Sequence, residues 1–155
     1  MLESHQISLR LLEDNDLEFL YAVENDSANK KYGSDNGYLS KKTLKAYIKN
    51  SGADINVYGQ QRFVITLNNT PIGLIDLFDF DQFERSAFVG IIIINKYQNN
   101  NYGSNALELL ISYSWDKLDL LSLYANINSL NNASVSLFNK FYFKKIKDTL
   151  YKLDR

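Results

Sequence analysis

The sequence contains no cysteine and a single histidine, His5, among its 155 residues. The lack of cysteine excludes disulfide bonds, zinc sites built from thiolates, and a cysteine nucleophile that would carry an acyl group during a reaction. One histidine does not supply a multi-imidazole metal site, and its place near the N-terminus argues against a Ser-His-Asp triad. We therefore expect no metal site and no acyl-enzyme built on cysteine.

A large net charge and long apolar runs are absent as well. The 17 Lys and Arg residues face 18 Asp and Glu residues, for a net charge of −1, whereas a nucleic-acid surface needs clustered positive charge. The most apolar run, residues 88–94, is far shorter than the roughly 20 residues of a membrane span. Residues 1–5 lack the basic and apolar regions of a secretory signal. We expect a cytoplasmic protein that binds neither nucleic acid nor a membrane.

The sequence does contain strand-like and helix-like segments in alternation, within the usual length of one domain, so we expect a single α/β domain over residues 1–155. Apolar alternation or uniformly apolar runs predict strands over residues 7–11, 62–67, 71–80, 87–94, 122–127 and 144–153. Helical spacing predicts a helix capped by Asp14, one from Ser40 to residue 51, one over residues 104–117, and one capped by Asn131 or Asn132. Residues 25–37 are predicted to form a polar connection between the first two helices.

A polar loop separates the uniformly apolar strand at residues 87–94 from the helix that follows it. The loop and the start of the helix read Gln98-Asn99-Asn100-Asn101-Tyr102-Gly103-Ser104. The first turn of a helix carries N–H groups without intrahelical partners, and the helix dipole favours negative charge there. A strand, a loop and a helix in this order form an anion-binding site, although many such loops in α/β proteins bind no ligand.

Two motifs carry a resemblance to a known family. Gln98-x-x-Asn101-x-Gly103 resembles the Gln/Arg-x-x-Gly-x-Gly/Ala pyrophosphate loop of the GNAT superfamily of N-acetyltransferases. Further along the chain, residues 131–143 resemble the second signature of this superfamily, in which an Asn caps a helix that ends at Lys-x-Gly-Phe. The resemblance extends from residue 7 to residue 143. Within the superfamily, the chain is most similar to the branch of spermidine acetyltransferases and ribosomal-protein N-terminal acetyltransferases.

The resemblance implies a fold and a cosubstrate. The fold is α/β, with a central mixed, mostly antiparallel sheet that is flanked by helices and splayed at its two central strands, residues 87–94 and 122–127. The cosubstrate is acetyl-CoA, whose pantetheine arm would lie between those strands. The residues implied to bind it are Ile92, Ile93 and Ile94 through their backbone groups, Gln98, Asn99, Asn100, Asn101, Tyr102, Gly103 and Ser104 around the pyrophosphate, Asn131 beside the pantetheine or adenosine, and Lys140 at a phosphate. Lys140 fits an exposed helix position without a ligand equally well.

The implied reaction is direct attack of an amine on the thioester, which agrees with the lack of cysteine. A primary amine has a pKa of about 10.4 and must lose a proton before it attacks, so a carboxylate base is expected. Asp76, in the middle of the predicted strand 71–80, is the first candidate, although an aspartate on the solvent face of a strand is an equal alternative. Other acidic residues are expected to attract a cationic acceptor instead, or to be plain surface charge: Asp79, Asp81 and Glu84 in the following connection, and Glu24 and Asp26 at the end of the first helix. The acidic residues near Asp76 favour a cationic acceptor.

A general acid would protonate the thiolate that leaves. Its pKa, about that of cysteine at 8.5, makes it a good leaving group that needs little help. Ser134 matches the position of such an acid in the ribosomal-protein branch, and it also fits a plain helix cap.

Four features depart from the family pattern. Asn101 stands at the first loop glycine, where asparagine tolerates positive φ, and the bulky Tyr142 replaces the glycine before Phe143. Phe138 stands where many relatives have a tyrosine. Few residues follow Phe143, where relatives have a hairpin of two strands, so we expect an acceptor pocket that is open or completed by a second subunit in a homodimer.

The predicted function is acetyl transfer to a primary amine of a polyamine, a small amino compound or a peptide N-terminus. The alternative is a degenerate domain that binds CoA or a protein partner without catalysis. Retained binding of acetyl-CoA without turnover on any amine would select the alternative.

Overall fold

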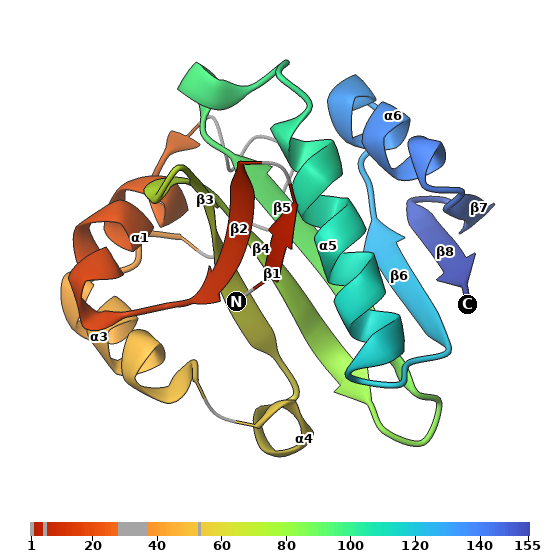
Figure 1. The fold of residues 1–155 in the computed structure, drawn as a ribbon, viewed down its shortest axis with the longest axis horizontal. Helices are drawn as coiled ribbons and strands as arrows, with labels where there is room; N and C mark the ends of the chain where they lie inside the picture. Colours follow the sequence, from red (N-terminus) through yellow and green to blue (C-terminus); the bar gives the residue numbers. More distant parts are fainter. Residues whose placement is uncertain (1, 5, 28–36, 53) are drawn as a thin grey trace.

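A computed structural model describes residues 2–4, 6–27, 37–52 and 54–155, and its centre is an eight-stranded sheet in the order β1-β2-β3-β4-β5-β6-β8-β7 (Figure 1). The strands are β1 Leu2–Ser4, β2 Ile7–Leu11, β3 Gln61–Leu67, β4 Thr70–Asp81, β5 Ser86–Ile93, β6 Ser122–Asn126, β7 Lys144–Lys147 and β8 Leu150–Asp154. The described helices are α1 Leu17–Glu24, α3 Lys41–Asn50, α4 Ile55–Tyr58, α5 Tyr102–Asp116 and α6 Asn132–Lys140, with short 3-10 turns η1 Asp14–Asp16 and η2 Asn95–Tyr97.

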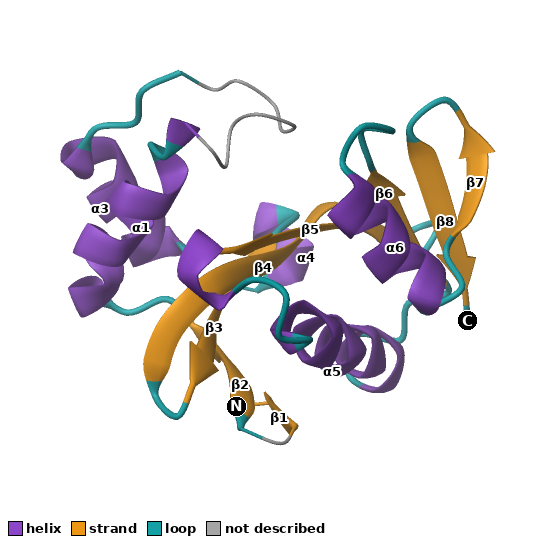
Figure 2. Ribbon diagram, turned by 90° about the horizontal axis from the view of Figure 1, so that it is seen from above, coloured by secondary structure: helices purple, strands orange, loops and turns teal. Residues whose placement is uncertain are grey.

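The sheet is mixed and mostly antiparallel, as predicted. Neighbouring strands pair antiparallel throughout the described sheet except at its centre, where β5 and β6 run parallel. The helices α1 and α3 lie on one side of the sheet and α5 and α6 on the other (Figure 2). None of the described helices combines the length and the apolar character that crossing a membrane requires.

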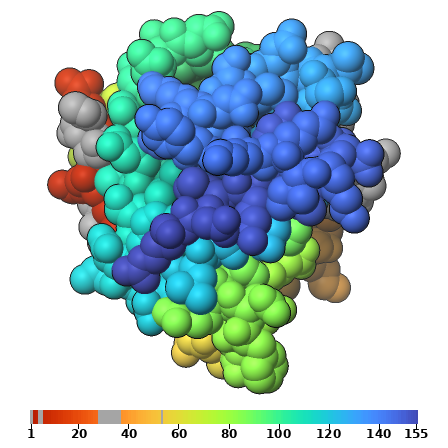
Figure 3. Space-filling model, turned by 90° about the vertical axis from the view of Figure 1, so that its right-hand side faces the viewer, coloured from red at the N-terminus to blue at the C-terminus, as the bar shows by residue number. Residues whose placement is uncertain are grey.

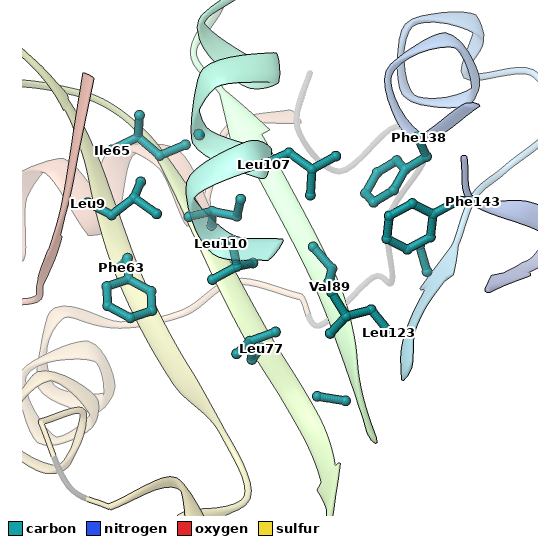
Figure 4. Packing of buried hydrophobic residues seen from close by; sticks show 14 of the residues in the cluster. Leu9, Phe63, Ile65, Leu77, Val89, Leu107, Leu110, Leu123, Phe138 and Phe143 are labelled. Carbon is teal, nitrogen blue, oxygen red and sulfur yellow. The ribbon is translucent and has the colours of Figure 1, made fainter. Parts of the chain in front are cut away.

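Two apolar clusters hold the helices on the sheet, and alternation along the strands assigns each side chain to one of them. On one face, Phe63 and Ile65 belong to the same buried cluster as Leu107 and Leu110 of α5 (Figure 4). Val64, between them in the chain, is buried in the cluster formed with residues of α1 and α3. The sheet is therefore covered on both faces at β3 and β4, which explains the near-continuous apolar sequence of these strands.

The start of the first helix differs from the prediction that Asp14 caps it. Asp14 instead opens the 3-10 turn, and α1 begins at Leu17. Asp16 is buried in this turn because its carboxylate accepts hydrogen bonds from the Glu13 N–H at 2.7 Å and from the Arg10 guanidinium at 2.8 and 2.9 Å. The ion pair with Arg10 of β2 thus explains why Asp16, rather than Asp14, is the acidic residue held at the start of the helix.

The second helix begins as predicted. The Ser40 hydroxyl accepts a hydrogen bond from the Thr43 N–H at 3.1 Å at the start of α3. The predicted polar connection over residues 25–37 lies largely outside the described residues, which resume at Gly37.

The C-terminal residues form two strands rather than the single strand predicted over residues 144–153. β7 and β8 pair antiparallel across a tight turn at Asp148, whose φ is 45°. β8 also pairs with β6, so this hairpin continues the sheet and forms much of one side of the molecule (Figure 3). The expectation that the chain is too short for this hairpin is therefore wrong, because strands of four and five residues suffice.

The two central strands separate, as the resemblance implied. β5 pairs with β6 only at Ser86, Ala87 and Phe88, opposite Ser122, Leu123 and Tyr124. β5 continues to Ile93 beside β4, while the last residues of β6 pair with β8 alone. Beyond Phe88, the edge of β5 that faces β6 has no strand partner among the described residues. We call this space between the strands the gap.

Candidate active site

The backbone of β5 presents alternate residues to the gap. The Ile94 N–H donates to the Ile72 carbonyl of β4 at 2.9 Å. Because backbone groups alternate along an antiparallel pair, Ile92 also turns towards β4, whereas Ile91 and Ile93 turn towards the gap. Backbone groups of Ile92, Ile93 and Ile94 were expected to bind the pantetheine arm. The Ile94 N–H is not available for this because it donates to Ile72, and Ile92 faces β4 rather than the gap.

The loop after β5 is held by its own side chains. The Gln98 amide nitrogen donates to the Ile93 carbonyl at 2.8 Å, and the Asn100 amide nitrogen donates to the Gln98 carbonyl at 2.9 Å. Asn99 and Asn101 adopt left-handed backbone conformations, with φ of 65° and 64°, which asparagine tolerates better than other residues that carry a side chain. The polar side chains of the loop thus fix its path.

The first turn of α5 is open at its N-terminus. No side chain caps this helix. Within the described part of the chain, no backbone carbonyl accepts from the N–H groups of Tyr102, Gly103 and Ser104. Three N–H donors and the positive end of a 15-residue helix therefore point out of the loop.

A cation from the second signature lies at the same turn. The Lys140 ammonium, on the last residue of α6, donates to the Ser104 hydroxyl at 3.2 Å. A methyl group on Gly103 would lie 3.6 Å from Leu137 of α6 and 3.8 Å from Ile91 and from Ile93, so the two helices and β5 meet here. Backbone donors and a lysine together make a site suited to a diphosphate.

Asn131 and Ser134 occupy the first turn of α6. The Asn131 side-chain oxygen accepts from the Ser134 N–H at 3.2 Å, as an N-cap does. Ser134 is half-buried. Phe138, further along this helix, is 3% exposed and packs edge-on against Phe143 with ring centroids 4.9 Å apart. The position at which many relatives have a tyrosine therefore belongs to the core.

Tyr142, directly after the C-cap of α6, adopts a left-handed backbone conformation that is usually found at glycine. Its φ is 70°, its N–H donates to the Asn139 carbonyl, and the Phe143 N–H donates to the Phe138 carbonyl. This pattern and the contact between Phe138 and Phe143 form a Schellman motif. The Tyr142 side chain is 79% exposed, so it meets no obstacle in solvent and the fold keeps the turn without glycine.

Asp76 lies on the face of the sheet that carries α1 and α3, next to the strand that borders the gap. In the register of the sheet it pairs with Arg62 of β3 on one side and Gly90 of β5 on the other. A methyl group on Gly90 would lie only 2.8 Å from Asp76 Oδ1. The missing side chain at Gly90 therefore lets the carboxylate extend over β5.

A buried cation links Asp76 to the first helix. The Arg62 guanidinium hydrogen-bonds to Glu24, the last residue of α1, and lies 3.7 Å from Asp76 Oδ2. Burial would lower the pKa of Arg62, but Asp76 and Glu24 outweigh it and raise that pKa. Burial raises the pKa of the Asp76 carboxyl, the Arg62 charge opposes this rise, and the Glu24 charge adds to it. A carboxylate that binds a proton more readily than usual is a better base near neutral pH.

The other acidic candidates are not brought together with Asp76. Asp79 lies at a bulge with φ of 48° and is exposed, and Asp26 is exposed beyond α1. Asp81 Oδ1 accepts from the N–H groups of Phe83 and Glu84, each at 2.9 Å, and thereby shapes the turn between β4 and β5. Only Glu24 joins Asp76 in one cluster, through Arg62, whose role the sequence analysis missed.

Comparison with known proteins agrees with this geometry. The sequence profile of the acetyltransferase (GNAT) domain matches residues 6–144. The spermidine N(1)-acetyltransferase of Escherichia coli strain K12 is 26% identical over 146 residues, which cover 92% of this chain and 75% of that protein.

Solved structures share the fold. The spermidine N-acetyltransferase of Vibrio cholerae in complex with CoA and spermine superposes with a TM-score of 0.87 at 24% identity, over 96% of this chain and 95% of that chain. A dodecameric structure of the same Vibrio cholerae enzyme in an intermediate state gives a TM-score of 0.81 at 23% identity, over 96% and 94% of the two chains. The gap, the open first turn of α5 and the profile match together place the chain in the GNAT superfamily of acetyl-CoA-dependent N-acetyltransferases, in the branch that resembles the spermidine and ribosomal-protein acetyltransferases.

Proposed function

We propose that the chain, as a single domain over residues 1–155, transfers the acetyl group to a primary amine of a polyamine, a small amino compound or a peptide N-terminus. The observation that carries the proposal is the Asp76 carboxylate, extended over Gly90 beside the gap. The similarity to the spermidine acetyltransferases of Escherichia coli and Vibrio cholerae supports a polyamine among these acceptors.

Binding of acetyl-CoA falls to the backbone of the gap and to the first turn of α5. The N–H groups of Tyr102, Gly103 and Ser104 suit the pyrophosphate, and the contact of Lys140 with Ser104 supports a role for this lysine at a phosphate. Gln98, Asn99, Asn100 and Asn101 contribute by holding the loop in its conformation. In the gap, the backbone of Ile91 and the Ile93 N–H suit the amides of the pantetheine arm, while the Ile93 carbonyl accepts from Gln98. Asn131 lies at the start of α6.

Asp76 is the proposed base. When bound, the cosubstrate supplies a thioester whose carbon forms the new C–N bond as its C–S bond breaks. The acceptor nitrogen carries an excess proton at neutral pH, and the Asp76 carboxylate takes up that proton directly or through a water. Since the pKa of Asp76 is raised by burial, we expect activity to rise as the pH rises through that pKa and the carboxyl loses its proton.

Ser134 is the proposed proton donor to the leaving thiolate, and its hydroxyl regains a proton, the one that the nitrogen loses as the amide forms. It lies in the first turn of α6, and its N–H is already engaged by Asn131, which fixes the backbone that carries the hydroxyl. Since Phe138 is in the core and has no hydroxyl, Ser134 is the residue of this helix that we assign to the task. The expected contribution is small, because a thiolate leaves readily.

The decisive experiment is calorimetric titration of the purified protein with acetyl-CoA, followed by an amine panel with thiol release as the readout. The panel contains spermidine, spermine, small amino compounds and a peptide with a free N-terminus. Binding with turnover on one class of amine is the expected result. Binding without turnover would select the degenerate domain, and absence of binding would overturn the proposal. Sedimentation of the same sample tests the predicted homodimer, which stays a prediction beside the dodecameric Vibrio cholerae relative.

A further inference from the structure

We propose that Arg62 is a positioning residue that holds the Asp76 carboxylate over Gly90, and that Glu24 limits how strongly Arg62 acts on it. The inference rests on the proposed role of Asp76 as the base. It assigns a function to a buried charge cluster from three elements: Glu24 of α1, Arg62 of β3 and Asp76 of β4.

The contacts of Arg62 are unequal. One guanidinium nitrogen hydrogen-bonds to Glu24, whereas the other lies 3.7 Å from Asp76, beyond hydrogen-bond distance. Arg62 therefore acts on the pKa of Asp76 more through its charge than through hydrogen bonding. A carboxylate held in this way keeps its lone pairs available for a proton that comes from the acceptor.

The cluster is largely shielded from solvent. The side chains of Glu24, Arg62 and Asp76 are each 17% exposed, and the Tyr47 ring of α3 lies 5.6 Å from the Arg62 guanidinium carbon. The Arg62 Nε atom is buried without a hydrogen-bond partner among the described residues. Because burying an unpaired donor is unfavourable and a buried ion pair often stabilises a fold no more than apolar side chains would, packing alone does not account for these charges.

The charges around Asp76 can be enumerated element by element. β3 contributes Arg62, α1 contributes Glu24, and α3 contributes Tyr47, whose pKa is raised by burial and which is therefore uncharged. β5 contributes Gly90, which has no side chain, and Asp79 on β4 itself is exposed. One cation is thus shared by two carboxylates, so removal of either partner should shift the pKa of Asp76 in a direction known beforehand.

The test is a titration of the Asp76 carboxyl by carbon-13 NMR, with Asp76→Asn used for assignment, beside the pH profile of kcat/KM. In Arg62→Gln we expect the pKa of Asp76 and the acid limb of the profile to rise together by about one to three units. In Glu24→Gln we expect both to fall by about one unit, because a like charge is removed. In Arg62→Lys, which keeps the charge without the planar fork, we expect a pKa near that of the wild type and a lower kcat.

Arg85→Gln is the matched control. Arg85 also forms an ion pair, with Asp119, but both partners are 40% or more exposed, and they lie outside the strands, directly before β5 and between α5 and β6. This variant should leave the profile unchanged. If the pKa of Asp76 stays constant in Arg62→Gln and in Glu24→Gln, the inference is overturned, whether or not the enzyme is active.

The two proposals fail in different ways. Full activity of Asp76→Asn would remove Asp76 as the base and would overturn the catalytic meaning of the cluster, while the NMR titration would still report on Arg62. If the pKa of Asp76 rises in Arg62→Gln and falls in Glu24→Gln, and the acid limb of the kcat/KM profile shifts with it, both proposals are supported. A variant that unfolds is recognised by circular dichroism, and Arg62→Lys then carries the test.

Discussion

The two halves of the candidate site differ in the chemical groups that form them. The half around the first turn of α5 is made of backbone N–H groups from consecutive residues, with Lys140 added from α6. The half around Asp76 is made of side-chain charges from three elements that are far apart in the sequence. A site made of backbone tolerates changes of side chain that keep its conformation, whereas a site made of buried charges depends on each residue. The first half can thus be read from a local motif, and the second only from the sheet register.

The largest expected effect is on the half made of side chains. Asp76→Asn removes the proposed base without a large change in volume, so we expect kcat to fall by about 10² to 10⁴ with the affinity for acetyl-CoA unchanged. The rate of thiol release measures kcat, and calorimetry measures the affinity for acetyl-CoA. Asp79→Asn, on the same strand but exposed, is the control and should retain full activity. A loss of acetyl-CoA affinity in Asp76→Asn would mean that the two halves are not independent.

The next effect is on the half made of backbone. Gly103→Glu would place a negative charge at the first turn of α5, and we expect the Kd for acetyl-CoA to rise about a hundredfold, or about 2.7 kcal/mol. Gly103→Ala should bind as the wild type does, because a methyl group there has neighbours at ordinary distances of 3.6 and 3.8 Å. If Gly103→Glu keeps its affinity in calorimetry, the pyrophosphate does not lie at this turn.

The smallest effect concerns stability alone. Tyr142→Gly replaces an exposed residue at a φ of 70°. The relief of the left-handed conformation is partly offset by the greater freedom of glycine in the unfolded chain. We expect a gain of about 0.5–1 kcal/mol and a rise in Tm of about 1–4 °C, with unchanged acetyl transfer. Tyr142→Ala should show no such gain in thermal denaturation. A gain in both variants would point to the Tyr142 side chain, rather than its backbone, as the cause.

The sequence predicted what depends on neighbouring residues. Apolar runs predicted the strands β3 to β6, and asparagine at position 101 indicated a left-handed backbone; the structure confirms both. The anion site at the polar loop before α5 stays a prediction. Features that depend on residues far apart in the sequence were predicted wrongly or not predicted at all. Arg10 selects Asp16 over Asp14 at the first turn, and the register of β3 and β4 sets Arg62 opposite Asp76. Neither contact follows from spacing along the chain.

The hairpin of β7 and β8 was missed for a different reason. Residues 144–153 are a plausible single strand by composition, and only the left-handed Asp148, with φ of 45°, turns them back. An aspartate between two short runs is a common turn residue, so the sequence did contain an indication of the turn. The hairpin extends the sheet beyond β6, so the short C-terminal segment is no longer a reason to expect an open acceptor pocket.

The early end of the pairing between β5 and β6 also has a consequence for solvent exchange. Successive amides along β5 beyond Phe88 alternate between a bonded and an unbonded state: the Ile94 N–H is held by Ile72, whereas those of Ile91 and Ile93 face the gap. Their hydrogens should exchange with deuterium at alternately slow and fast rates within one otherwise regular strand. A molecule bound in the gap, with carbonyl groups that accept from the Ile91 and Ile93 N–H groups, would slow the exchange of these amides. All amides in this part of β5 would then exchange slowly, so the exchange rates would show whether the gap is occupied.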